Sequence, residues 1–411
     1  MPAVALIGTL DTKGDEIAYV RERLIALRVD VIVIDSGILG EPHCAADISH
    51  EEVAAAGGHT LDHVRHAGSR GAAVSLMQEG VRALATQLFA RGRIQGVLCL
   101  GGAEGALIGA AAMQALPVGV PKLLVSPSAS GRRAFAPFVG ESDVCVMHSV
   151  VDILGLNGIS RPIFDNAAAA MAGMVHDAGS ALGTLGEHCV GITMLGQTTP
   201  GVMRLREALV TAGHEPVIFH ANGVGGPAME HLCEEGALQG VVDYTLSELA
   251  NALLDGVHTP PNAAERLTVA GRLGLPQVIV PGCVDFFNQG ARDTVPERYR
   301  DRQSYFHNPV ATLVRLTRDE EVELGRVVAE RLNAATGPVH VVAPLRGFSL
   351  ADSEGGDLWN PVADGAFLDS LSGTLRADIP FEAVDAHVDD QDFADIVAAR
   401  YLALVPETVD A

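Results

Sequence analysis

Residues 4–14 read Val4-Ala5-Leu6-Ile7-Gly8-Thr9-Leu10-Asp11-Thr12-Lys13-Gly14, an apolar run that ends at a glycine and passes directly into polar residues. A short apolar run bounded by glycine is typical of a strand that is buried on both faces of a parallel sheet. Residues 15–27 follow with apolar side chains at helical spacing. The segment therefore predicts a strand, a tight turn and a helix, which is the repeating unit of an α/β fold.

The same unit recurs through the first half of the chain. The predicted strands are 4–7, 29–34, 96–100, 122–125 and 144–147, and the predicted helices are 15–27, 51–56, 75–91, 105–113 and 166–176. Strands that alternate with helices in this way predict a doubly wound parallel sheet.

The pattern starts again after a glycine-rich joint at residues 178–187. The second set of predicted strands is 190–194, 215–220, 240–244, 277–280 and 339–343, with helices starting near Gly201, Gly226, Thr245, Arg318 and Gly365 and a last helix at 390–403. Residues 284–309 break the pattern and are interpreted as a long irregular loop, and connections of that length are usually functional. We therefore expect an α/β protein of two Rossmann-like domains, 1–184 and 185–411, each a mostly parallel sheet with helices on both faces.

Charge and composition exclude several classes of protein. The 411 residues carry 28 Lys and Arg against 51 Asp and Glu, a formal net charge of −23 at pH 7. A chain this acidic has no long-range attraction to nucleic acids or anionic lipids, so we expect neither partner. No apolar run reaches the roughly 18 residues of a membrane span, and the first residues do not resemble a signal peptide. The six cysteines form no CxxC pair and are interpreted as reduced thiols, so we expect a cytoplasmic protein.

Polar turns follow the predicted strands where the ligands of doubly wound sheets bind, outside the carboxyl ends of the strands. The first turn, residues 8–14, offers Thr9, Asp11, Thr12 and Lys13 next to a helix N-terminus, which is a suitable cradle for a phosphate group. Its spacing matches neither GxxxxGK[ST] nor GxGxxG. A capped turn without a ligand is the alternative interpretation.

Two more turns reach the same edge of the first predicted sheet. Gly101 and Gly102 allow the backbone to approach a ligand closely, and Glu104 can bind a ribose hydroxyl or a magnesium-bound water. Asp35, at the end of the second strand, stands where an acidic residue contacts the ribose in nucleotide-binding sheets. The alternative interpretation of Gly101 and Gly102 is that they only allow the chain to bend and do not contact a ligand.

The second predicted domain has its own candidates. Residues 220–226, His-Ala-Asn-Gly-Val-Gly-Gly, form a glycine-rich turn in which Gly223, Gly225 and Gly226 are predicted to contact a nucleotide. His220, Asp285 and Arg346 follow three different strands of that domain. Together an imidazole, a carboxylate and a guanidinium can perform acid–base work on an anionic substrate, so these three are the candidate catalytic residues. Each also has a structural alternative.

Five motifs, GTLDTKGDE at 8–16, GGAEG at 101–105, FHANGVGG at 219–226, PGCVDF at 281–286 and HNP at 307–309, make the chain resemble one family. It is similar to the bacterial proteins related to the ATP-binding N-terminal region of the tomato mosaic virus resistance protein. The resemblance implies a homodimer that binds ATP with Mg²⁺. It places nucleotide contacts at Thr9, Asp11, Thr12, Lys13, Gly101, Gly102 and Glu104, with Asp11 and Glu104 serving the metal. Ala106 stands where many family members have threonine.

Three hypotheses follow for function. The first is an ATP-binding protein that holds Mg·ATP near a cleft between the domains and activates a small anionic molecule, such as a carboxylate or a sugar acid. The second is a nucleotide-binding sensor or scaffold dimer without turnover. The third is an ATP-independent hydrolase or lyase that works through the loops of the second domain.

Overall fold

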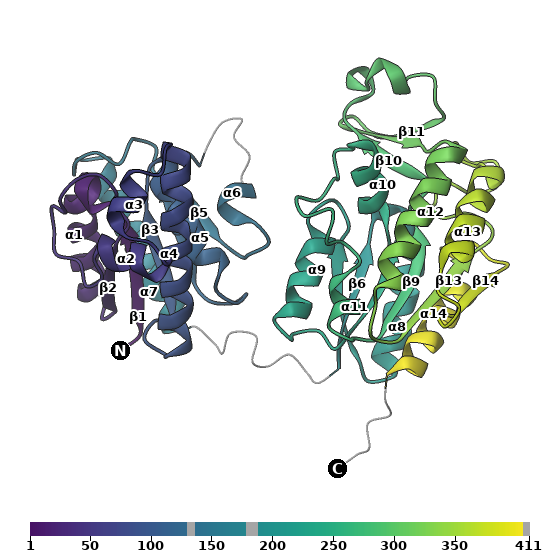
Figure 1. Cartoon of the computed structure of the whole chain (residues 1–411), viewed down its shortest axis with the longest axis horizontal. Coiled ribbons are helices and arrows are strands. Elements are labelled where there is room, and N and C mark those ends of the chain that lie inside the picture. The colour runs from purple at the N-terminus through teal and green to yellow at the C-terminus, as the bar shows by residue number, and fades with distance from the viewer. Residues whose placement is uncertain (130–135, 178–187, 406–411) are drawn as a thin grey trace, which may run out of the picture. The chain divides into compact units, whose positions relative to one another are not determined.

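The chain folds into two compact units, Met1–Thr184 and Leu185–Ala411, each built on its own sheet (Figure 1). The computed structural model describes residues 1–129, 136–177 and 188–405. The predicted glycine-rich joint at 178–187 lies outside these residues. In the described ranges, no helix combines the length and apolar character needed to cross a bilayer.

The first unit alternates strands and helices from its first residues onward. Its strands are β1 (Ala3–Gly8), β2 (Asp30–Asp35), β3 (Gly96–Leu100), β4 (Lys122–Ser126) and β5 (Cys145–His148). Its helices are α1 (Leu10–Ala26), α2 (His50–Ala56), α3 (Leu61–Arg65), α4 (Arg70–Ala90), α5 (Ala103–Gln114), α6 (Ala136–Val139) and α7 (Ser160–His176).

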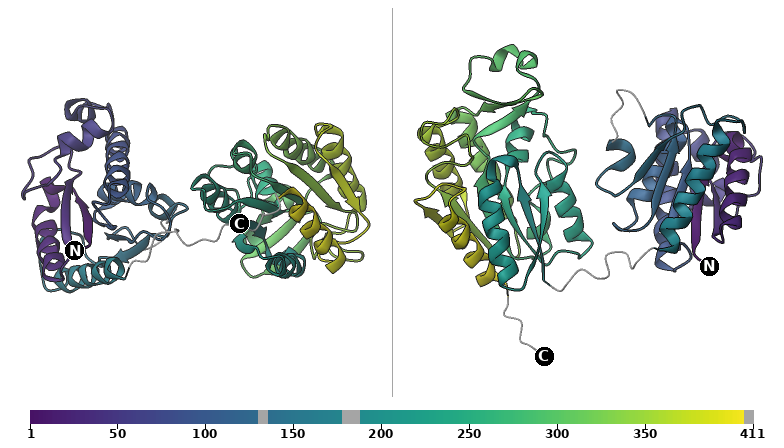
Figure 2. Two further views of the ribbon diagram at one scale, coloured as in Figure 1. Left: turned by 90° about the horizontal axis from the view of Figure 1, so that it is seen from below. Right: turned by 180° about the vertical axis from the view of Figure 1, so that it is seen from behind.

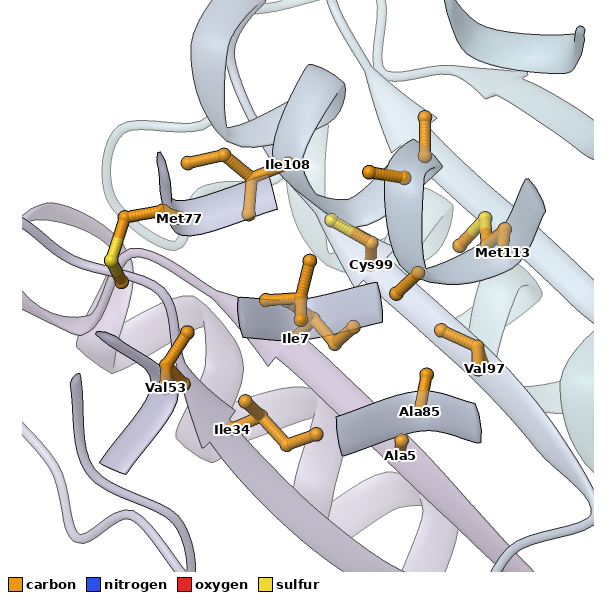
Figure 3. Close-up of a cluster of buried hydrophobic side chains, with 14 of the residues drawn as sticks. Ala5, Ile7, Ile34, Val53, Met77, Ala85, Val97, Cys99, Ile108 and Met113 are labelled. Atoms are coloured by element: carbon orange, nitrogen blue, oxygen red, sulfur yellow. The ribbon is translucent and has the colours of Figure 1, made fainter. Parts of the chain in front are cut away.

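The five strands pair in parallel in the order β2-β1-β3-β4-β5. Side chains of α1 and α7 pack on one face of this sheet, and those of α2, α4 and α5 pack on the other. Figure 2 shows the helices on both sides of the strands. Figure 3 shows buried side chains of the cluster on the face covered by α4 and α5, among them Ile7, Met77, Cys99 and Ile108. Because both faces are covered, every residue of β3 and β4 is buried.

The close packing of α5 on β3 makes a testable prediction. A Cβ atom added at Gly109 would lie 2.1 Å from the Cys99 Sγ atom, so Gly109→Ala should destabilise the first unit by about 1–3 kcal/mol through overpacking. Gly173→Ala is the matched control, since no atom lies within 4 Å of its added Cβ in helix α7. Replacing that helical glycine should stabilise by roughly 0.5–1 kcal/mol. Urea denaturation followed by circular dichroism measures both, and equal effects of the two variants would contradict the packing.

The second unit continues the alternation with longer connections. Its strands are β6 (Cys189–Met194), β7 (Glu215–His220), β8 (Gly240–Thr245), β9 (Gln277–Gly282), β10 (Phe286–Gln289), β11 (Ser304–Asn308), β12 (Ala311–Arg315), β13 (Val339–Pro344) and β14 (Phe381–Val384). Its helices are α8 (Thr199–Thr211), α9 (Gly225–Glu234), α10 (Ser247–Leu254), α11 (Val269–Arg272), α12 (Arg318–Asn333), α13 (Pro361–Thr374) and α14 (Gln391–Leu404), with short 3₁₀ turns at Gly196–Thr198, Arg292–Thr294 and Glu297–Tyr299.

Six strands form a parallel sheet in the order β14-β13-β9-β8-β6-β7, with α8 and α14 on one face and α10, α12 and α13 on the other. The remaining three pair antiparallel in the order β10-β12-β11 and project beyond one end of the large sheet (Figure 1). The predicted fold class is therefore confirmed: each unit is a parallel sheet with helices on both faces.

The structure corrects three details of the prediction. Residues 284–309, predicted to be an irregular loop, contain β10 and β11. Strands β12 and β14 and the short helices α6 and α11 were not predicted. Helix α1 begins at Leu10 rather than near residue 15, and a local kink at Lys13, with φ −128°, lies where the sequence predicted a turn.

Candidate functional site

A pocket of about 920 Å³ lies in the first unit, at the carboxyl ends of its strands. The chain passes from β1 to β2 on one side and then returns to β3 on the other, so the winding direction reverses between β1 and β3. Ligands of doubly wound sheets bind at this switch point. The pocket is lined by Thr9, Asp11, Thr12, Lys13, Ser36, Ile38, Leu39, Arg65, His66, Gly68, Ser69, Arg70, Ala73, Val74, Gly102, Ala103, Glu104, Gly105, Ile108, Pro127 and Asp152.

The turn after β1 supplies the first wall of the pocket. Only Thr9 lies between β1 and α1, so the N-terminus of the helix lies at the carboxyl edge of the sheet. The Thr9 and Thr12 hydroxyl oxygens are 2.9 Å apart. Among the described residues, no ion pair engages the half-buried Lys13 ammonium group. The helix N-terminus, two hydroxyls and a cation thus face one space, as a phosphate site requires.

The glycine pair after β3 supplies the opposite wall. A Cβ atom at Gly101 would lie 2.4 Å from the Ala106 nitrogen, so this position requires glycine for the bend. Gly102 is the N-cap of α5, has no side-chain cap, and would meet no atom within 4 Å if a Cβ were added. The open backbone at Gly102 therefore leaves the N-terminus of α5 accessible to a ligand in the pocket.

Two carboxylates in the pocket fit the predicted metal role in part. Asp11 Oδ2 accepts a hydrogen bond from the Gly40 amide at 3.0 Å, whereas its buried Oδ1 atom has no hydrogen-bond partner among the described residues. Glu104 pairs with Arg70, with 2.5 Å between Oε2 and Nη2. No cluster of three His, Cys, Asp or Glu able to hold a metal occurs in the described residues. Mg²⁺ commonly takes only one or two carboxylates plus substrate phosphates, so these residues fit an ion brought with a nucleotide.

Sequence reasoning missed the basic residues of the pocket. Arg65 ends α3, His66 lies between α3 and α4, and Arg70 begins α4, so none of the three follows a strand. Ser69 caps α4 by accepting a hydrogen bond from the Ala72 amide, so α4 begins before its predicted start at residue 75. The serine at Ser69 was the available signal for this helix start.

These residues alter the local charge balance. The pocket is lined by Lys13, Arg65 and Arg70 against Asp11, Glu104 and Asp152, so its ionised side chains balance in a chain of net charge −23. The pocket can therefore accept an anion that the rest of the surface repels.

Asp35, predicted to contact a ribose, lies beneath the pocket instead. Its Oδ1 atom accepts hydrogen bonds from the Leu10 amide at 3.0 Å and the Gly37 amide at 2.8 Å. Burial raises the pKa of the Asp35 carboxyl, and both hydrogen bonds oppose that rise. Asp35 thus links the backbone after β1 to the backbone after β2 and holds in place the two turns that lie next to the pocket.

The glycine-rich turn of the second unit is closed by an internal carboxylate. The amides of Gly223 and Gly226 donate to Glu248 Oε1 at 2.9 and 3.2 Å. A Cβ atom at Gly225 would lie 2.1 Å from the His220 carbonyl oxygen. The Glu248 carboxylate stands where the sequence predicted the phosphate of a nucleotide.

A buried arginine holds this carboxylate in turn. Arg266 is fully buried and binds Glu248 at 2.6 Å and Asp243 at 2.5 Å, with Glu230 at 3.4 Å. Burial raises the pKa of Glu230 to about 7 despite the nearby guanidinium. The network therefore ties β8, α9 and α10 together from within.

The three candidate catalytic residues have separate surroundings. His220 is exposed at the end of β7. Asp285 is fully buried, and its Oδ2 atom accepts a hydrogen bond from the Ser349 hydroxyl at 2.8 Å. Arg346 is exposed and binds Asp385 at 2.7 Å. Among the described residues, no hydrogen bond or ion pair joins any two of the three, so their predicted cooperation gains no support from this geometry.

The carboxyl edge of β6 and β8, where winding reverses in the second unit, is occupied by the chain itself. The Gln197 carbonyl accepts a hydrogen bond from the Leu350 amide at 2.9 Å, and Gln197 Oε1 accepts one from the Ala351 amide at 3.0 Å. The Thr198 and Thr245 hydroxyls are 2.8 Å apart and buried. The loop after β13 thus packs on the edge at which a ligand would otherwise bind.

Comparison with known proteins agrees with the motifs. Residues 2–180 match the N-terminal domain, and residues 187–405 the C-terminal domain, of the family described as "Uncharacterised protein family (UPF0261)". The UPF0261 protein of Clostridium tetani is 38% identical over 405 residues, 98% of each chain. The UPF0261 protein RA0729 of Rhizobium meliloti is 39% identical over 403 residues, again 98% of each.

A plant relative confirms the predicted resemblance. The ToMV resistance protein Tm-1(GCR237) of Solanum lycopersicum is 32% identical over 430 residues, which cover 99% of this chain and 56% of the tomato protein. Among solved structures, the putative UDP-N-acetylglucosamine 2-epimerase of Listeria monocytogenes aligns over 67% of this chain and 78% of its own at 11% identity with a TM-score of 0.21, too low a likeness to inform on function. The chain belongs to the UPF0261 family.

Proposed function

We propose that the first unit binds a nucleoside triphosphate, ATP with Mg²⁺, in the pocket at the switch point of its sheet. The observation that carries the proposal is the meeting of the turn Thr9–Lys13 and the open N-terminus of α5 on one pocket of about 920 Å³. Two helix N-termini and an ammonium group suit the triphosphate. The proposal includes the cytoplasmic location expected from the sequence, which fractionation tests, and the homodimer implied by the resemblance, which light scattering tests.

The pocket also suits the base of a nucleotide. Apolar side chains line it alongside the charged ones: Ile38, Leu39, Ala73, Val74 and Ile108. Ligand pockets of this kind combine an apolar wall with a few polar groups that fix orientation. Inorganic phosphate would use only the polar part, so a nucleotide should bind more tightly than phosphate or pyrophosphate.

Asp11 and Glu104 would hold the magnesium ion, which would neutralise charge on the phosphates. Asp11 offers the oxygen that has no partner among the described residues. Glu104 is available once Arg70 turns from it toward a phosphate, a change open to Arg70 because its side chain is 77% exposed. Lys13 would bind a phosphate oxygen.

Thermal melting and calorimetry of the whole chain test the proposal. We expect Mg·ATP to raise the melting temperature, with about 2.7 kcal/mol of stabilisation at a ligand concentration 100 times the dissociation constant. GTP, NAD and pyrophosphate are the comparison ligands. Release of ADP or AMP with added carboxylates or sugar acids separates an enzyme from a nucleotide-binding sensor. No shift with any nucleotide would overturn the proposal.

The lysine content allows a second test. The chain has only two lysines, Lys13 and Lys122. The Lys122 ammonium group is fully buried and binds Asp143 at 2.6 Å, so Lys13 carries the accessible side-chain amine. An acyl-phosphate derivative of ATP should acylate Lys13, and excess ATP should protect it. Peptide mapping has Lys122 as its internal control, and labelling of Lys13 that ATP does not reduce would contradict the predicted phosphate position.

A further inference from the structure

A second arginine of the second unit is buried among carboxyl groups. Arg315, the last residue of β12, is 2% exposed. Its guanidinium lies 2.5 Å from Glu321 of α12, contacts Asp364 of α13, and donates to the backbone carbonyl of Asp285 at 2.6 Å. The guanidinium therefore joins the antiparallel sheet to the two helices that cover the large sheet.

Four carboxyl groups surround this one guanidinium. Asp285, Glu321 and Asp352 are fully buried and Asp364 is 7% exposed. Asp352 belongs to the loop after β13, and its Oδ2 atom accepts a hydrogen bond from the Phe348 amide at 2.9 Å. Four ionised carboxylates against one guanidinium would leave a large unbalanced charge in a buried site, which is strongly unfavourable.

Each of the four carboxyl groups also has one oxygen without a partner. Among the described residues, Asp285 Oδ1, Glu321 Oε2, Asp352 Oδ1 and Asp364 Oδ2 are buried and accept no hydrogen bond. A buried carboxyl that cannot pair with a cation is neutralised by a proton instead. With one guanidinium for four buried carboxyl groups, protons can balance the remaining charge of the site.

Other charged groups near the cluster are few. His387, in the loop after β14, favours the ionised form of Asp352. Burial raises the pKa of the Cys283 thiol most, and the charge of Asp389 in the same loop adds to that rise. Arg302 donates to the Arg315 carbonyl but is paired with Glu320. Of these groups only His387 can add positive charge near the cluster, and Arg302 and Asp389 supply no second cation to it.

We propose that Asp285, Glu321, Asp352 and Asp364, the Arg315 cluster, keep at least one proton at neutral pH and form a proton-linked clasp in the second unit. The clasp joins the loop before β10, the end of β12, helices α12 and α13, and the loop after β13. Loss of its protons at alkaline pH loosens the antiparallel sheet and the start of α13. No part of this clasp lies in the nucleotide pocket, so the inference stands apart from the proposed function.

The pKa values of all four carboxyl groups are raised, as expected for carboxyl groups that share one buried guanidinium. Burial and the charge of Asp352 raise the pKa of Asp285 to about 7, and burial raises that of Asp364 to about 8. Burial likewise raises the pKa values of Glu321 and Asp352. The folded chain therefore holds more protons than the unfolded chain between the ordinary carboxyl range and about pH 8, so stability falls as pH rises through that window.

Unfolding of the whole chain in urea tests the clasp. Trp359 is the only tryptophan and lies in the second unit, so its fluorescence reports on that unit. Between about pH 6 and pH 8 we expect the unfolding equilibrium constant to rise with pH by up to about tenfold per pH unit for each proton released. Asp285→Asn and Asp364→Asn should reduce this slope, and each should remove intensity from the infrared carbonyl band of protonated carboxylic acids.

Two further variants make the result specific. Asp385→Asn is the matched control, because Asp385 is exposed and its pairing with Arg346 lowers its pKa, so the slope should not change. Glu230→Gln removes a carboxyl group of raised pKa from the Arg266 network. The change in slope that this variant causes measures how much of the pH dependence of unfolding comes from that network. Unchanged slopes and an unchanged infrared band in both Asp285→Asn and Asp364→Asn would overturn the proposal. Infrared spectra of the folded variants decide the question even if urea unfolding is not two-state.

Discussion

Lys13→Ala is expected to remove most of the stabilisation of the protein by Mg·ATP. A hydrogen bond to a charged group contributes about 1.5–3 kcal/mol, so the dissociation constant should rise by about 10- to 150-fold. The effect is large because Lys13 is the cation of the turn after β1 and, in the described residues, no acidic side chain pairs with it. Calorimetric titration of the variant with Mg·ATP measures the change.

Two controls separate the loss of the phosphate contact from general damage. Lys13→Arg keeps the positive charge and should retain more affinity than Lys13→Ala. Arg91→Ala removes an exposed cation at the opposite end of α4 from Arg70 and should leave the affinity unchanged. Equal affinities of wild type and Lys13→Ala would place the triphosphate elsewhere. A lowered melting temperature of unliganded Lys13→Ala would instead point to a structural role at the kink of α1.

Arg266→Met is expected to destabilise the second unit by about 3–5 kcal/mol, the usual cost of removing one partner from a buried ion pair. Methionine fills a similar volume but leaves Asp243, Glu248 and Glu230 without their cation. The Gly223–Gly226 turn would lose the support of Glu248 at the same time. Urea denaturation followed by Trp359 fluorescence measures the loss.

Arg272→Met is the matched control for this variant. Arg272 lies six residues further along the chain, is 61% exposed, and binds the exposed Glu234 at 2.6 Å. An exposed ion pair contributes about 0–1 kcal/mol, so the control should change stability by no more than that. Similar losses for the two variants would show that the Arg266 network contributes no more than a surface pair.

The sequence predicts the large parallel strands well because they are buried on both faces and therefore form continuous apolar runs. β3 and β4 are buried at every residue, which makes their signal unambiguous. β11 and β14 are partly exposed, so their side chains do not form such runs and the strands were missed. β10 and β12 are almost entirely buried and were missed as well, so burial alone does not make a short strand predictable.

The same reasoning explains which parts of the site were predictable. Thr9, Lys13, Gly102 and Glu104 follow strands, and parallel strands bring their carboxyl ends together whatever lies between them in the chain. Arg70 follows no strand, so only the packing of α4 reveals that it reaches the pocket. The turn at Gly223–Gly226 gives the same sequence signal as a phosphate-binding turn, and only the fold shows that Glu248 already accepts its hydrogen bonds.

The loop that follows β13 gives the second unit a built-in competitor. Because Leu350 and Ala351 already occupy Gln197 at the edge of β6, an outside molecule could bind there only during the fraction of time in which the loop has left. Its apparent affinity would be lowered by that fraction. Shortening the loop would raise this affinity without changing any residue of the sheet edge. Two units with the same order of strands can therefore differ in whether a ligand binds at the edge, because one loop covers it in the second unit.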